Sequence, residues 1–107
     1  KEAMALRKAW VTHQDHTVVA KECIRAFKWK SILMYEMPWN NLSFKTQVFI
    51  EVDQIDLEKK CEALSKYKSQ SKRVYFNKDF QKSLLKVRGV QAGLKYAECF
   101  ETPRIYL

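Results

Sequence analysis

Glycine, proline and histidine are scarce in this sequence, whose 107 residues include two of each. The glycines, Gly89 and Gly93, form no glycine-rich phosphate-binding loop, so the sequence carries no such motif for a nucleotide. Its uncharged apolar runs fall far short of the roughly 18 residues of a transmembrane helix, which predicts no membrane span. Low-complexity segments and internal repeats are also lacking, so we expect a folded domain.

Cysteine pairs are lacking as well. Cys23, Cys61 and Cys99 are odd in number, far apart and without a CxxC spacing. Each lies in an apolar pattern, where a free cysteine packs as a small hydrophobic residue. We therefore expect a reduced, cytoplasmic setting and no metal site built from cysteines.

Apolar residues and positive charge are abundant. A content of 47% hydrophobic and 13% aromatic residues is enough for the core of one small domain. The net charge of +8 favours an anionic partner. The lysines are dispersed and form no basic and aromatic platform, so we do not expect nucleic-acid binding.

Helical and strand patterns alternate along the chain, which predicts an α/β layered fold with a largely parallel sheet. The expected elements are the last turns of a helix over 1–8, a short strand over 9–11, a helix over 17–27, strands over 31–35 and 47–52, a helix capped by Asp53 or Asp56, a helix capped by Asn77 or Asp79, and a last strand over 104–107. The expected buried faces are Val19, Cys23, Ile24 and Phe27 in the first full helix, Leu57, Cys61 and Leu64 in the second, and Phe80, Leu84, Val87 and Gln91 in the third.

The stretch Thr12-His13-Gln14-Asp15-His16 holds both histidines, with a carboxylate between them, immediately before a predicted helix. The positive potential of a helix N-terminus disfavours imidazolium, so a histidine there tends to stay neutral and can donate a lone pair to a metal. The alternative is a variant capping box of Thr12 and Asp15 with two ordinary surface histidines. Spacing alone leaves both interpretations open.

Several motifs together resemble a known family. They are Thr12-His13-Gln14-Asp15-His16, Ser31-Ile32-Leu33-Met34-Tyr35-Glu36, Lys68-Ser69-Gln70, Arg88-Gly89-Val90-Gln91-Ala92-Gly93 and Tyr96-Ala97-Glu98-Cys99-Phe100-Glu101. In this order they resemble the C-terminal half of a LmbE-like, or PIG-L-type, zinc-dependent de-N-acetylase. The resemblance implies a Rossmann-like layered sheet and hydrolysis of an N-acetyl group from an N-acetylglucosamine-type sugar conjugate.

The resemblance also implies roles for three residues. His16 matches the family's zinc ligand, His13 matches the histidine that stabilises the oxyanion of the tetrahedral intermediate, and Asp15 matches the acid that orients that histidine. Two further residues are substrate candidates: Trp39, whose ring suits stacking on a sugar, and Arg88, which suits an anionic substituent. For Trp39 the alternative is packing, and for Arg88 it is a salt bridge with Glu98 or Glu101.

The sequence departs from the family's pattern in one important respect. The His-Pro-Asp-Asp element, which supplies the other two zinc ligands and the general base, is absent. We expect residues 1–107 to be a single partial domain, with residues omitted near 11/12, or else a degenerate relative. One ligand cannot hold catalytic zinc, so this chain alone should be inactive. The alternatives are a non-catalytic basic module that engages an anionic partner and a structural piece that completes a domain or a homo-oligomer.

Overall fold

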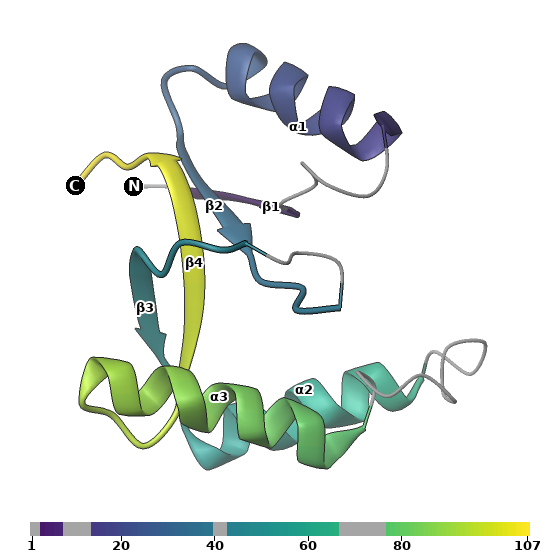
Figure 1. The fold of residues 1–107 in the computed structure, drawn as a ribbon, viewed down its shortest axis with the longest axis vertical. Coiled ribbons are helices and arrows are strands. Elements are labelled where there is room, and N and C mark those ends of the chain that lie inside the picture. Colours follow the sequence, from purple (N-terminus) through teal and green to yellow (C-terminus); the bar gives the residue numbers. More distant parts are fainter. Residues whose placement is uncertain (1–2, 8–13, 40–42, 67–76) are drawn as a thin grey trace. The chain divides into compact units, whose positions relative to one another are not determined.

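The computed structural model describes residues 3–7, 14–39, 43–66 and 77–107, and for residues 3–7 and 14–17 it describes the backbone. The elements, in chain order, are β1 (Ala3–Arg7), α1 (Gln14–Ala26), β2 (Ser31–Tyr35), β3 (Val48–Glu51), α2 (Gln54–Ser65), α3 (Lys78–Ala92) and β4 (Ala97–Arg104). Figure 1 labels each of these elements. The predicted α/β class is confirmed for these residues.

The described residues form two compact units. Unit 1 comprises residues 1–48 and 99–107, and unit 2 comprises residues 49–98. The division passes through β3 and β4, so β4 contributes residues to both units. Each unit has its own buried cluster and is described by itself.

Unit 1 is built on a β-α-β arrangement. β1 pairs with β2 in parallel, from Ala3 opposite Ser31 to Arg7 opposite Tyr35, and α1 connects the two strands. Ala20 of α1 is buried with Ile32 and Met34 of β2. α1 therefore covers one face of this strand pair.

The buried face of α1 differs from the predicted one. Ala20 is buried and Ile24 packs beside it, whereas Val19 is 59% exposed and Phe27 40% exposed. Successive residues are separated by about 100° around a helix, so a face centred on Ala20 and Ile24 turns Val19 toward solvent. The small Ala20 side chain fits where the helix lies against the strands, but alanine gives only a weak hydrophobic signal in the sequence.

β4 runs antiparallel to β2, with Met34 opposite Glu101 and Ile32 opposite Arg104. The register shifts by one residue between these pairs, which places Thr102 and Pro103 opposite Leu33 alone. Such a bulge accommodates a proline, whose nitrogen cannot donate to the ladder. The Thr102 hydroxyl donates to the Ile32 carbonyl at 2.6 Å, so it supplies a bond where the regular ladder is interrupted.

The order of hydrogen-bonded strands is β1-β2-β4-β3. The Gln47 N–H donates to the Phe100 carbonyl, and the Val52 N–H donates to that of Tyr96. Residue numbers rise along one strand as they fall along the other, so β3 and β4 are antiparallel. The helices α2 and α3 connect β3 to β4. One helix leads away from the end of β3 and the other leads back, so β4 starts at the end of the sheet where β3 stops.

Three sequence predictions about strands are therefore wrong. The described sheet is mixed, not largely parallel, because β4 is antiparallel to its neighbours. Residues 3–7 form a strand, not the end of a helix, and the final strand is Ala97–Arg104, not 104–107. The strand predicted over 9–11 lies outside the described residues. Strands at 31–35 and 48–51 are confirmed.

Unit 2 packs α2 and α3 around Leu57, Leu85 and Tyr96, with Val52 and Cys61 partly buried against them. α2 begins with a capping box in which the Asp53 carboxylate accepts from the Asp56 N–H at 2.7 Å. The Asn77 side chain accepts from the Asp79 N–H at 2.7 Å and caps α3. The predicted caps Asp53 and Asn77 are confirmed.

The buried face of α3 is one residue away from the predicted one. Gln81, Leu85 and Gly89 are buried, whereas Val87 is 54% exposed. A Cβ on Gly89 would lie 2.6 Å from the Lys95 carbonyl oxygen, so this position has room for glycine alone. A polar residue and a glycine occupy the centre of the face, and a hydrophobicity pattern therefore misses it.

Candidate functional site

The carboxyl ends of β1 and β2 define the candidate site in unit 1. Because the two strands are parallel and α1 connects them, α1 runs back antiparallel to both. The N-terminus of α1 therefore lies at the carboxyl ends of the strands, as Figure 1 shows. Ligands of open α/β sheets commonly bind at this edge.

Asp15 and His16 lie in the first turn of α1, which begins at Gln14 and not at Thr17 as the sequence suggested. The first turn of a helix has N–H groups without intrahelical partners and a positive potential. A histidine there is held toward its neutral, lone-pair-donating form, while a carboxylate is stabilised. The backbone position of both residues suits a site at this edge. Their side chains, Thr12 and the whole of His13 lie outside the described residues, so the capping-box alternative stays open.

Trp39 reaches the same edge from another element. The segment Glu36-Met37-Pro38-Trp39 follows the carboxyl end of β2, and Trp39 is 38% exposed. Parallel pairing of β1 and β2 thus brings the start of α1 and the segment after β2 to one edge of unit 1. Stacking of the Trp39 ring on a sugar stays a prediction.

Glu36 is a site candidate that our sequence reasoning missed. It is half-buried and comes directly after Tyr35, the last residue of β2. An ionisable side chain at the carboxyl end of a buried strand is a signal that the sequence does contain. Glu36 and Trp39 therefore both belong to the segment that follows β2 at this edge.

Arg88 lies in unit 2, on α3, and is half-buried. Its Nη1 donates to the Gln91 side chain at 2.9 Å. Glu98, one of its suggested salt-bridge partners, accepts from the Lys60 ammonium group at 2.8 Å. The role of Arg88 toward a substrate stays a prediction.

Among the described residues, no group of three or more histidine, cysteine, aspartate or glutamate side chains is placed to hold a metal ion. A catalytic zinc site uses three protein ligands and one open position. His16 supplies one of these by the resemblance, and the chain has only one other histidine. The described residues therefore do not form a complete zinc site, and zinc ligation by His16 stays a prediction.

None of the three cysteines forms a disulfide; Cys99 is buried, and Cys23 and Cys61 are partly buried. Their predicted role as small packing residues is confirmed for Cys61, which packs against the cluster of Leu57, Leu85 and Tyr96. Within the described part of the chain, no helix is long and apolar enough to span a membrane. Comparison of the chain with protein-family models, with curated proteins and with solved structures gives no match.

Proposed function

We propose that this chain is the C-terminal part of a Rossmann-like, LmbE-like zinc-dependent de-N-acetylase, which hydrolyses the N-acetyl group of an N-acetylglucosamine-type sugar conjugate. One structural observation carries most weight: the β1-α1-β2 arrangement has Asp15 and His16 in the first turn of α1, at the carboxyl ends of the strands. The proposal requires the His-x-Asp-His element to lie at a ligand-binding edge of the sheet. Three cysteines outside any disulfide support the proposal of a reduced, cytoplasmic setting.

Each residue of the element has a separate task in this proposal. His16 would hold the zinc through a ring nitrogen. His13 donates a hydrogen bond to the oxygen that gains negative charge when the acetyl carbonyl is attacked. Asp15 accepts from the other ring nitrogen of His13, which fixes the orientation of the ring and stabilises its positive charge. The zinc, when bound, supplies a water of lowered pKa and polarises the carbonyl.

The proposal requires two more zinc ligands and a general base from outside these 107 residues. The strands that carry them would extend the sheet beside β1, which is the last strand on its side in the described order. Trp39 would stack on the sugar ring at the same edge. Its replacement by alanine is expected to raise KM more than it lowers kcat, and phenylalanine should restore part of the loss.

The decisive experiment uses the longest natural polypeptide that contains this sequence, purified without chelators. We expect bound zinc and release of acetate from an N-acetylglucosaminyl conjugate. His16→Ala should lose the zinc. His13→Ala should keep it and lower kcat by roughly 10²- to 10³-fold, the size seen when one oxyanion donor is removed.

Asp15→Asn is the control for orientation, and it should keep the zinc with an intermediate loss of rate. Near-absence of zinc together with no acetate release would refute the proposal. So would a His13→Ala variant that loses zinc while His16→Ala retains it, because the two roles would then be exchanged.

A further inference from the structure

The other end of α1 carries an exposed aromatic side chain among basic ones. The four residues Phe27-Lys28-Trp29-Lys30, here called the α1–β2 turn, connect α1 to β2. Trp29 is 76% exposed and Phe27 is 40% exposed. The Nζ of Lys28 lies 5.5 Å from the centroid of the Trp29 ring. An indole left in water keeps its apolar surface available for burial against another apolar surface.

Hydrogen bonds hold the backbone of the α1–β2 turn that carries Trp29. The Lys30 N–H donates to the Phe27 carbonyl at 3.0 Å and closes the turn. From β4, the Arg104 guanidinium donates to the carbonyls of Phe27 and Lys30. The Tyr106 hydroxyl donates to the Lys28 carbonyl at 3.1 Å. These bonds fix the backbone on both sides of Trp29, so the indole is presented on an ordered support.

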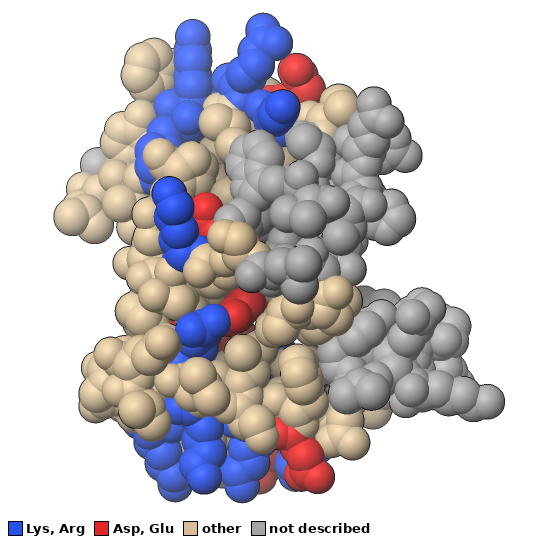
Figure 2. All heavy atoms as spheres, viewed as in Figure 1, with Lys and Arg blue, Asp and Glu red and all other residues tan. Residues whose placement is uncertain are grey.

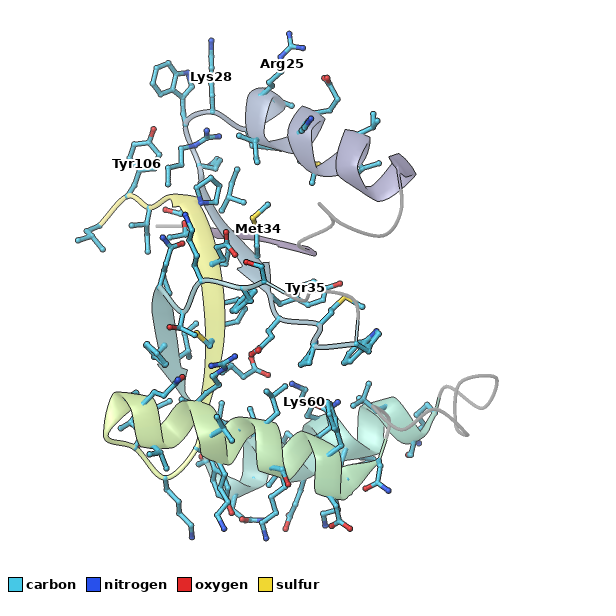
Figure 3. The ribbon with its side chains drawn as sticks, viewed as in Figure 1. Arg25, Lys28, Met34, Tyr35, Lys60 and Tyr106 are labelled. Atoms are coloured by element: carbon cyan, nitrogen blue, oxygen red, sulfur yellow. The ribbon has the colours of Figure 1, made fainter. Side chains whose placement is uncertain are left out.

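Basic residues lie close to Trp29 along the chain. Lys28 and Lys30 flank Trp29, and Arg25 lies in the last turn of α1. Figure 2 shows Lys and Arg side chains gathered over the end of α1 and the turn. In Figure 3, Arg25 and Lys28 point outward from this end, with Tyr106 beside the turn. The nearby carboxylate of Glu22 is paired with Arg25 at 3.4 Å.

We propose that the α1–β2 turn docks unit 1 on an anionic phospholipid surface, with Trp29 seated among the headgroups and Lys28 and Lys30 on lipid phosphates or carboxylates. Tryptophan suits the membrane interface because its side chain combines an apolar ring with a polar N–H. Each nearby Lys or Arg adds attraction to an anionic leaflet. The Trp29 ring thus suits the apolar part of the membrane interface, and the lysines suit its anionic headgroups.

A single-stranded nucleic acid is the competing occupant, and the geometry favours it less. Proteins that bind single-stranded nucleic acids hold the backbone in a basic groove and stack several aromatic rings on the bases. Trp29 instead projects from the tip of a four-residue turn, and Lys28 stands over one face of its ring. A projecting ring suits insertion into a headgroup layer.

The turn is distant from the edge considered above. α1 has 13 residues, so its two ends are about 20 Å apart. Docking through the turn therefore leaves the carboxyl ends of β1 and β2 pointing away from the lipid surface. The inference does not rest on the proposed hydrolase activity, and each can fail without the other.

The experiment measures co-sedimentation of the full chain with vesicles of phosphatidylcholine alone or with added phosphatidylserine. We expect binding to the anionic vesicles that weakens as salt is raised. Trp29→Ser should lower the ratio of bound to free protein about tenfold. Lys28→Gln should lower it about fivefold, the factor that one basic residue contributes near an anionic leaflet.

Two matched variants in unit 2 serve as controls. Val90→Ser removes an apolar side chain that is 79% exposed on α3, and Lys59→Gln removes an exposed charge on α2. Both should bind as the parent chain does. Equal loss in Lys59→Gln and Lys28→Gln would overturn the proposal, because net charge alone would then explain binding. Absence of vesicle binding, alone or together with binding to a single-stranded oligonucleotide, would also overturn it.

Discussion

The guanidinium group of Arg104 donates to three carbonyl groups around the end of α1. Its Nη2 donates to the carbonyls of Ile24, at 2.7 Å, and Phe27, and its Nε donates to that of Lys30 at 3.1 Å. The last carbonyls of a helix lack intrahelical partners, and a cation there also opposes the helix dipole. A residue on β4 therefore terminates a helix that lies some 80 positions earlier in the chain.

Replacement of Arg104 by alanine should lower the free energy of unfolding by about 1.5–3 kcal/mol, the range for hydrogen bonds to a charged group. Urea titration followed by circular dichroism measures the loss. Arg25→Ala is the control, because the Arg25 side chain is 79% exposed and pairs with Glu22 in the same helix; its expected effect is below about 0.5 kcal/mol. Equal effects in the two variants would contradict this role for Arg104.

The two glycines make different demands at the residue scale. Gly89 is buried, and an added Cβ would lie 2.6 Å from the Lys95 carbonyl oxygen and 2.7 Å from that of Leu94. Gly93 has a φ of 71° and ends α3, with nothing within 4 Å of an added Cβ. Gly89 is needed for space and Gly93 for a left-handed backbone.

Gly89→Ala should therefore destabilise the chain more than Gly93→Ala. Overpacking against rigid backbone costs about 1–3 kcal/mol or more, whereas a non-glycine residue in the left-handed region costs about 1–2 kcal/mol. Thermal unfolding of the two variants in parallel provides the comparison. A reversed order would mean that the turn between α3 and β4 can move away from the helix.

At the scale of elements, the N-terminus of α2 depends on a reciprocal pair of aspartates. The Asp53 carboxylate accepts from the Asp56 N–H at 2.7 Å, and the Asp56 carboxylate accepts from the Asp53 N–H at 3.4 Å. Asp53→Ala should cost about 1 kcal/mol, and Asp53→Ser should restore most of it because serine also caps helices well. Chemical denaturation measures both, and an unaltered stability in the alanine variant would contradict the capping box.

Local chemistry explains which elements were predictable. Caps such as Asp53 and Asn77 act over two or three residues, so the sequence shows them directly. β1 was mistaken for a helix because Ala-Met-Ala-Leu-Arg consists of good helix formers. Its strand conformation comes from pairing with β2, 28 positions later, and no local pattern encodes that pairing.

The candidate site was predictable to a similar extent. The type and order of residues in Thr12-His13-Gln14-Asp15-His16 carry the chemical hypothesis, and a helix beginning close to it was expected. Its place at the carboxyl ends of two parallel strands depends on long-range pairing and becomes visible only in the fold. Glu36 could have been singled out, because it directly follows a predicted buried strand, but that the segment after β2 shares an edge with the start of α1 follows only from the parallel pairing.

At the scale of the whole molecule, the separate clusters predict local responses to core mutations. Met34 is buried with Ala20 and Ile32 in unit 1, and Leu57 is buried with Leu85 and Tyr96 in unit 2. Each replacement by alanine should cost about 2–5 kcal/mol. Hydrogen exchange should show lost protection in α1 and β2 for Met34→Ala, and in α2 and α3 for Leu57→Ala. Uniform loss of protection in both variants would instead indicate a single cooperative unit.

Unit 1 is discontinuous in sequence, and this has a consequence for the growing polypeptide on the ribosome. Residues 49–98 are all synthesised before β4 is complete, so unit 2 has its helices available while unit 1 still lacks a strand. The Ile24 carbonyl near the end of α1 has no hydrogen bond from Arg104 until that residue is synthesised, and the Lys28 carbonyl likewise has none from Tyr106. Unit 1, which begins first in the sequence, is therefore completed last. A translation stop between residues 98 and 104 would leave all residues of unit 2 present, but α1 would lack its hydrogen bonds to Arg104.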